Sequence, residues 1–119
     1  MLTPLGRFLR KIRIDHGEIL ANMAEKLGVT ASYVSAVENG KRAMPREWRD
    51  KISAMYSLGE NQKTEFEGLV LDSIKTLSFS AENTTRMQKE VAFAFARKMA
   101  ELPEDKLLEI SKILGGDAK

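Results

Sequence analysis

Apolar side chains recur every three or four residues along the first third of the chain, the spacing of one helix face. A first helix is predicted to start after the capping pair Thr3-Pro4 and to end at His16-Gly17. A second helix ends at Gly28, and a third runs from Thr30 to Asn39. The apolar positions of the three helices are Leu5, Phe8, Leu9 and Ile12, then Leu20, Met23, Ala24 and Leu27, then Val34 and Val37.

The pattern continues through two more predicted helices. Pro45 opens a fourth helix that ends near Leu58-Gly59, and a fifth helix follows Asn61. Their expected buried faces are Trp48, Ile52, Met55 and Tyr56 in the fourth helix, and Phe66, Leu69, Val70, Ile74 and Leu77 in the fifth.

Small polar residues interrupt the period at residues 78–83, which we interpret as a linker. The alternation over residues 76–80 also fits a short strand that pairs across a dimer. Two further helices, at about 84–102 and 103–114, precede Gly115-Gly116. The sequence therefore predicts an all-α protein with a domain at residues 1–77 and a two-helix extension at residues 78–119.

Charge adds an asymmetry to this helical pattern. Residues 1–58 hold ten Lys/Arg against six Asp/Glu, a net +4, whereas residues 59–119 hold nine against eleven, a net −2. The amino-terminal half is therefore the better partner for a polyanion. No apolar stretch approaches the roughly 20 residues of a membrane span, the N-terminus does not resemble a secretory signal, and cysteine is absent. We expect a cytoplasmic protein with no membrane partner.

The predicted helix from Thr30 to Asn39 is the segment that points to a function. Only Val34 and Val37 are committed to the interior, which leaves the rest of this helix free of packing. An apolar helix, a turn at Gly28 and a second short helix of this size suit the major groove of DNA. The side chains expected on the free face are Ala31, Ser32, Tyr33, Ser35 and Ala36.

Three runs of residues carry a family resemblance: residues 9–13 ahead of Gly17, residues 23–29, and residues 34–41. Over about residues 5–58 the chain resembles the XRE, or phage-repressor-like, helix-turn-helix regulators. The resemblance implies a five-helix bundle that binds double-stranded operator DNA, usually as a homodimer, with the third helix in the major groove. At Ile19-Leu20 the chain departs from the polar cap and glutamine that are frequent in the family, so one typical DNA anchor is missing.

Carried over position by position, the resemblance implies base-edge contacts from Ala31, Ser32 and Ala36. Nearer the phosphates it places Tyr33, Ser35, Asn39 and Lys41. Because an alanine can meet a thymine methyl but cannot hydrogen-bond a base edge, we expect little direct readout. Phosphate contacts, DNA deformability and Lys41 or Arg42 at a groove edge are expected to supply much of the binding.

Other candidate residues have a structural interpretation. In the family, residues at the positions of Arg13 and Glu38 form an internal ion pair, which we favour over DNA contact for both. Trp48 is expected in the core, and His16 is expected to meet the last carbonyls of its helix. The chain has no catalytic Ser/His/Asp set, phosphate-binding loop or zinc-ligand cluster in its sequence, so we predict no enzyme activity, no cofactor and no metal.

The predicted sixth helix is apolar around most of its circumference. Met87, Val91, Phe95 and Met99 form one stripe, while Phe93 points elsewhere. Because a lone helical hairpin cannot bury both sides, the extension either packs on the bundle or forms an interface with a second copy or another protein. The expected interface residues are Val91, Phe93, Phe95 and Met99.

These features support two functions. The first is a repressor-type transcriptional regulator that binds an inverted repeat as a homodimer. The alternative is an antitoxin whose residues 78–119 bind a toxin protein while its DNA-binding part controls its own operon. A DNA-independent adaptor leaves the free face of the third helix unexplained.

Overall fold

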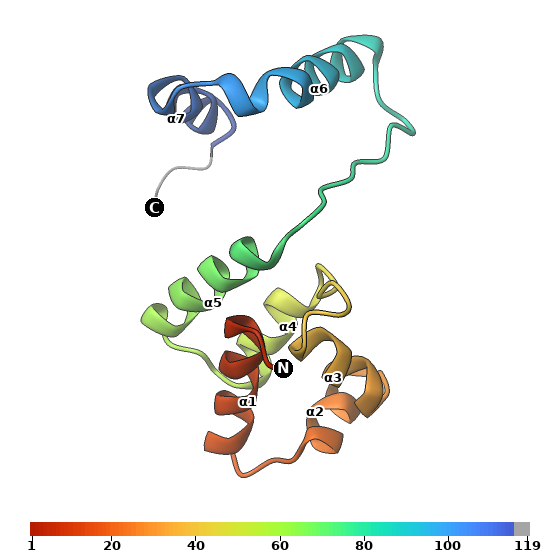
Figure 1. The fold of residues 1–119 in the computed structure, drawn as a ribbon, viewed down its shortest axis with the longest axis vertical. Helices are drawn as coiled ribbons and strands as arrows, with labels where there is room; N and C mark the ends of the chain where they lie inside the picture. Colours follow the sequence, from red (N-terminus) through yellow and green to blue (C-terminus); the bar gives the residue numbers. More distant parts are fainter. Residues whose placement is uncertain (116–119) are drawn as a thin grey trace. The chain divides into compact units, whose positions relative to one another are not determined.

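The computed structural model describes residues 1–115, and all regular secondary structure in that range is helical (Figure 1). The all-α prediction is therefore confirmed. The chain divides into two units, Met1–Leu77 and a second unit that starts at Ser78. The end of the predicted extension, including Gly116, lies outside the described residues.

The first unit holds five helices. They are α1 (Pro4–Asp15), α2 (Leu20–Leu27), α3 (Ala31–Glu38), α4 (Trp48–Met55) and α5 (Glu60–Ser73). Local signals fix several of their ends: the Thr3 hydroxyl accepts from the Gly6 amide at 3.0 Å, and the Thr30 hydroxyl accepts from the Tyr33 amide at 3.1 Å. Gly28 ends α2 in the left-handed conformation at φ 75°, where a side chain would be strained.

One apolar core joins the five helices: α3 packs against α1 and α2, α1 also packs against α5, and Trp48 and Ile52 of α4 belong to the same buried cluster. The rings of Phe8 and Phe66 stack with centroids 5.2 Å apart, which ties α1 to α5. The buried apolar residues are Leu5, Phe8, Leu9, Ile12, Met23, Ala24, Leu27, Val34, Val37, Trp48, Ile52, Tyr56, Leu58 and Phe66.

The start of α1 meets the end of α3 at very close range. The Thr3 amide and hydroxyl both donate to the carbonyl oxygen of Glu38, at 3.0 and 3.2 Å. A β-carbon on Gly6 would lie 2.0 Å from the same oxygen, so the two backbones can approach only because Gly6 has no side chain. This contact fixes the end of α3 against α1.

Two sequence predictions about helix ends are wrong. The fourth helix starts at Trp48 rather than at Pro45, because Pro45 belongs to a turn in which the Trp48 amide donates to its carbonyl at 3.1 Å. The fifth helix ends at Ser73 instead of continuing to Leu77.

The early end of α5 leaves two expected core residues in solvent: Ile74 is 40% exposed and Leu77 is 66% exposed. Within α5, Phe66 is the one residue that is fully buried. Leu69 and Val70 are only half-buried. With no core surface left beyond Val70, nothing offsets the modest helix propensity of the Thr- and Ser-containing sequence that follows. Residues 74–80 continue without regular structure.

The second unit consists of α6 (Arg86–Lys98), the 3₁₀ turn η1 (Met99–Glu101) and α7 (Glu104–Ile113). Thr85 and Gln88 form a reciprocal cap at the start of α6, with hydrogen bonds of 2.8 and 3.1 Å. None of the residues in these three elements is buried. Over residues 1–115, no helix has the length and apolar character to cross a bilayer.

Candidate nucleic-acid interface

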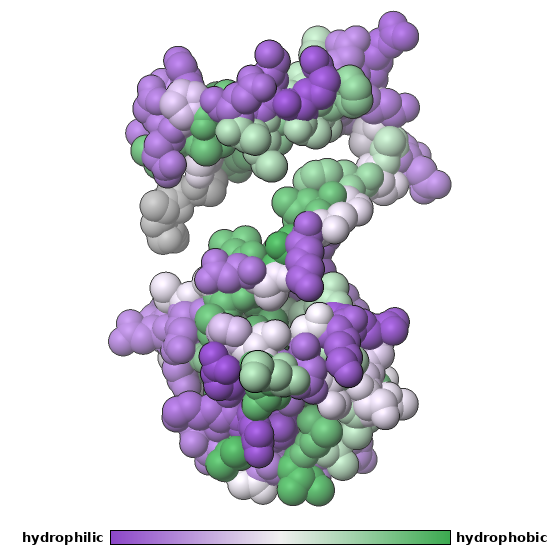
Figure 2. Space-filling model, viewed as in Figure 1, coloured by the Kyte–Doolittle hydropathy of each residue, from purple (hydrophilic) through white to green (hydrophobic). Residues whose placement is uncertain are grey.

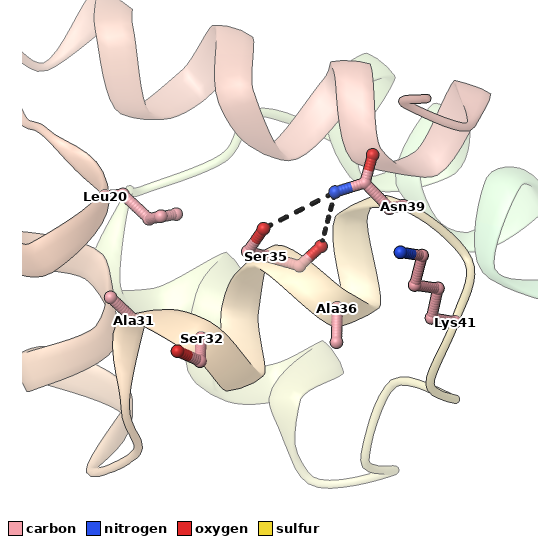
Figure 3. Close-up of a pocket in the computed structure, with 7 residues that line it drawn as sticks. All are labelled: Leu20, Ala31, Ser32, Ser35, Ala36, Asn39 and Lys41. Carbon is pink, nitrogen blue, oxygen red and sulfur yellow. Dashed lines mark hydrogen bonds between the residues drawn. The ribbon is translucent and has the colours of Figure 1, made fainter.

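The outer side of α3 faces solvent while its inner side is buried. Val34 and Val37 are 0% and 3% exposed, whereas Ser32 is exposed, and Ala31, Ser35 and Ala36 are half-buried. This helix is thus held by the core along one side only. A shallow pocket lies over its outer side (Figure 3), lined by Leu20, Ala31, Ser32, Ser35, Ala36, Asn39 and Lys41.

Leu20, which is expected in the apolar stripe of α2 and at the position where the family frequently has a polar DNA anchor, is also a member of this surface. It is the first residue of α2, and its side chain lines the same pocket as the outer residues of α3 (Figure 3). The Ile19 amide donates to the Asn22 side chain at 2.8 Å, so Asn22 caps α2 where residue 19 cannot. Leu20 therefore contributes apolar surface where the family frequently has a polar anchor.

The last turn of α3 is tied to the residues that follow it. The Asn39 side-chain amide donates to the Ser35 carbonyl at 2.9 Å and lies 3.4 Å from the Ser35 hydroxyl (Figure 3). The amides of Lys41 and Arg42 both donate to the Ala36 carbonyl, at 2.9 and 3.3 Å. The two exposed cations are thereby attached to the end of the helix by their backbones.

Tyr33, which is expected on the free face of α3, is only partly exposed. Its half-buried ring packs against Trp48, with centroids 5.6 Å apart at an angle of 43°. The Arg42 guanidinium carbon lies 4.5 Å from the centre of the Tyr33 ring. The helical period alone could not show this, because α4 covers Tyr33 only in the folded unit.

Arg13 and Glu38 form an ion pair inside the first unit. Arg13 Nη1 lies 2.5 Å from Glu38 Oε2 and 3.6 Å from the Met23 sulfur, and the two charged side chains are 7% and 5% exposed. Neither side chain can therefore reach DNA without unfolding its surroundings. The pair links the last turn of α1 to the last residue of α3.

A second polar cluster surrounds Glu18, just before α2. The Tyr56 hydroxyl donates to Glu18 Oε1 at 2.7 Å, and the Lys26 ammonium pairs with Oε2. Hydrogen bonds from Lys26 and then Tyr56 hold the pKa of Glu18 below its usual value of 4.5, while burial raises the pKa of Tyr56. His16 packs edge-on against Tyr56 at 5.0 Å, and its Nδ1 lies 3.0 Å from the Ile12 carbonyl. The cluster ties the α1–α2 connection to the end of α4.

This cluster predicts a pH-dependent stability. Because the pKa of Glu18 is lowered in the folded state, its stabilising contribution is present above the usual value of 4.5 and is lost as the pH falls below it. Glu18→Gln is expected to destabilise the protein at pH 7 and to lose that disadvantage progressively as the pH falls below 4.5, as measured by urea unfolding at each pH. Glu25→Gln, at an exposed position of α2, is the control and should leave the pH profile unchanged. If the free energies of unfolding of Glu18→Gln and of the unmodified protein changed in parallel with pH, ionised Glu18 would not be the source of the pH dependence.

The first unit contains two short helices, α2 and α3, joined by a tight turn at Gly28, with the outer side of the second open to solvent. This arrangement defines a helix-turn-helix protein.

Comparison with known proteins gives the same class. The model of the helix-turn-helix domain family matches residues 4–63, and the chain belongs to this family. Over 71 residues it is 31% identical to the HTH-type transcriptional regulator SinR of Bacillus licheniformis and to that of Bacillus subtilis (strain 168). The matched region covers 54% of this chain. It spans 64% of the length of each of the two relatives. No solved structure matches. The resemblance to the XRE regulators is confirmed.

Proposed function

We propose that this chain is a repressor-type transcriptional regulator that binds operator DNA through the outer side of α3. The observation that carries the proposal is the solvent-facing side of α3, whose inner valines are fully packed. The two SinR relatives are HTH-type transcriptional regulators, which supports the same function for this chain.

The side chains around the pocket suggest how the contacts divide. Ser32 is exposed and can hydrogen-bond a base edge, while Ala31, Ala36 and Leu20 can contact only apolar groups such as a thymine methyl. Ser35, Asn39 and the exposed cation Lys41 line the same pocket, and the family resemblance implies that they lie nearer the phosphates. Phosphate contacts would then supply much of the affinity, and Ser32 would supply a small hydrogen-bonded part of the specificity.

Two substitutions test this division on DNA selected from a random pool. Lys41→Ala is expected to weaken binding to all sequences alike and to lower the slope of log affinity against log salt by about 1. Ser32→Ala is expected to change the preferred sequence with little effect on the salt slope. Lys63→Ala, at an exposed position of α5, is the charge control and should bind as the unmodified chain does. Uniform losses from both test substitutions would contradict the division.

We further propose that the second unit, beginning at residue 78, joins two copies of the chain. In the view of Figure 2, hydrophobic residues gather along one edge of this unit and hydrophilic residues along the opposite edge. Four apolar residues of α6 and η1 lie in solvent in the single chain: Val91 at 60%, Phe93 at 67%, Phe95 at 38% and Met99 at 49% exposed. An apolar surface of this kind gains free energy when a partner covers it. A homodimer would match an inverted repeat with half-site centres roughly 34 Å apart.

Carboxylates introduced on the stripe formed by Val91, Phe95 and Met99 should separate the two copies. The double substitution Val91→Glu and Phe95→Glu is expected to give a monomer in sedimentation analysis, because each carboxylate would have to lose its hydration in the interface. DNA carrying the full inverted repeat should then bind no more tightly than a half-site. Lys89→Glu, which changes an exposed polar position of α6, is the control and should remain dimeric.

The same apolar face would serve the second candidate, an antitoxin that binds a toxin protein. An unmodified chain that is monomeric alone but forms a stoichiometric complex with a small protein encoded beside it would favour this candidate. A stable homodimer with the expected response to the double substitution would favour the repressor.

A further inference from the structure

Three side chains are in contact one after another from the core to the edge of α3. Trp48 is 2% exposed, the Tyr33 ring lies against it at 5.6 Å, and the Arg42 guanidinium lies over Tyr33 at 4.5 Å. Arg42 is itself exposed, and within residues 1–115 it forms no ion pair with a carboxylate. The outermost of the three side chains is therefore a cation whose charge no carboxylate among the described residues neutralises.

The Arg42 backbone is fixed as well. Its amide and that of Lys41 share the Ala36 carbonyl as acceptor, so the turn after α3 holds Arg42 beside the outer side of the helix. A guanidinium attracted to the face of an aromatic ring loses rotational freedom before any ligand arrives. Its N–H donors lie along the edge of its plane, where they match the oxygens of a phosphate.

We propose that Arg42 contacts a phosphate of the DNA backbone and that Tyr33 is the positioning residue that holds it there. Tyr33 then acts through Arg42 and does not itself contact DNA. This inference rests on the proposed DNA-binding function. It adds that Arg42 binds a phosphate and that Tyr33 positions Arg42.

A thermodynamic cycle on the full chain, with DNA selected from a random pool, tests the coupling. Arg42→Ala is expected to weaken all sequences about equally and to lower the salt slope by about 1. Tyr33→Phe keeps the ring and should bind like the unmodified chain. Tyr33→Leu keeps an apolar contact with Trp48 but removes the ring, so it should weaken binding about two- to five-fold. In the Arg42→Ala background, Tyr33→Leu should cause no further loss.

Other variants separate this mechanism from misfolding and from ordinary charge effects. Arg42→Lys keeps the charge but loses the planar donor set, so it should lower affinity while leaving the salt slope nearly unchanged. It keeps the proposal testable if Tyr33→Leu does not fold. Arg10→Ala, at an exposed position of α1, is the matched control and should bind normally.

Several results would overturn the inference. An equal Tyr33→Leu loss with and without Arg42 would show that the two residues act independently, and a loss in Tyr33→Phe would show that the hydroxyl meets DNA directly. Arg42→Ala losses confined to some sequences would indicate a base edge instead of a phosphate. Normal DNA binding by Arg42→Ala would refute this inference alone, whereas an unmodified chain that selects no DNA would refute the proposed function.

Discussion

Glu38→Ala is expected to lower the free energy of unfolding by about 3–5 kcal/mol, because it leaves the Arg13 charge buried without its partner. The two side chains are 7% and 5% exposed, and the remaining neighbour of Arg13 Nη1 is the Met23 sulfur at 3.6 Å, a weak acceptor. Since small domains are stable by only about 5–15 kcal/mol, the loss would remove much of the total. Urea unfolding followed by circular dichroism measures it.

A surface pair provides the comparison. Lys11 and Asp15 lie 3.1 Å apart with side chains 75% and 51% exposed, so Asp15→Ala should cost less than about 1 kcal/mol. The double change Arg13→Met with Glu38→Leu should cost less than Glu38→Ala alone, because it removes both buried charges and leaves neither unpaired. Equal costs for the buried and the exposed pair would show that burial does not govern this interaction.

Helix ends in the first unit were predictable where the signal is local. Thr3 and Thr30 cap their helices through hydrogen bonds to amides three residues away, and Gly28 supplies the left-handed residue that ends α2. Such contacts depend on a few consecutive residues, so a sequence pattern is sufficient to identify them. The family resemblance added the pairing of Arg13 with Glu38, which local rules cannot give.

Features that depend on distant packing were not predictable in the same way. The helical period placed Tyr33 on the outer side of α3, but Trp48, fifteen positions later, covers its ring in the folded unit. Ile74 and Leu77 continued the apolar period of α5, yet no core surface reaches them. Leu20 lines the outer pocket only because the Gly28 turn brings the start of α2 beside α3. In each case the deciding partner lies on another element.

In the second unit, too, the sequence pattern predicts the helices but not their packing partners. Its apolar period predicts α6 and α7, and both helices form, but the period does not say what covers them. In the single chain Val91 and Phe93 are 60% and 67% exposed, so a partner has to be sought outside the chain's own second unit. The domain roles proposed above therefore depend on the oligomeric state.

Gly6→Ala is expected to destabilise the first unit by about 1–3 kcal/mol, although alanine is the better helix former by about 1 kcal/mol. The added β-carbon would lie 2.0 Å from the Glu38 carbonyl oxygen and within 3 Å of two other backbone atoms of the same residue. No side-chain rotation can relieve a backbone clash, so α1 and α3 must move apart. The two hydrogen bonds from Thr3 to the Glu38 carbonyl would lengthen with them.

Gly68→Ala is the matched control, because Gly68 lies inside α5 with nothing within 4 Å of its added β-carbon. Because no clash opposes the higher helix propensity of alanine at this position, this change should stabilise the protein by about 1 kcal/mol. Opposite signs for the two glycine substitutions in thermal unfolding would isolate the close approach of α1 to α3 as the cause. Since Glu38 is the last residue of α3, Gly6→Ala should also weaken DNA binding under conditions where it is still folded, whereas Gly68→Ala should not. A stabilised Gly6→Ala protein would mean that the two helices can separate at no cost, and that α3 is not held in place by its contact with α1.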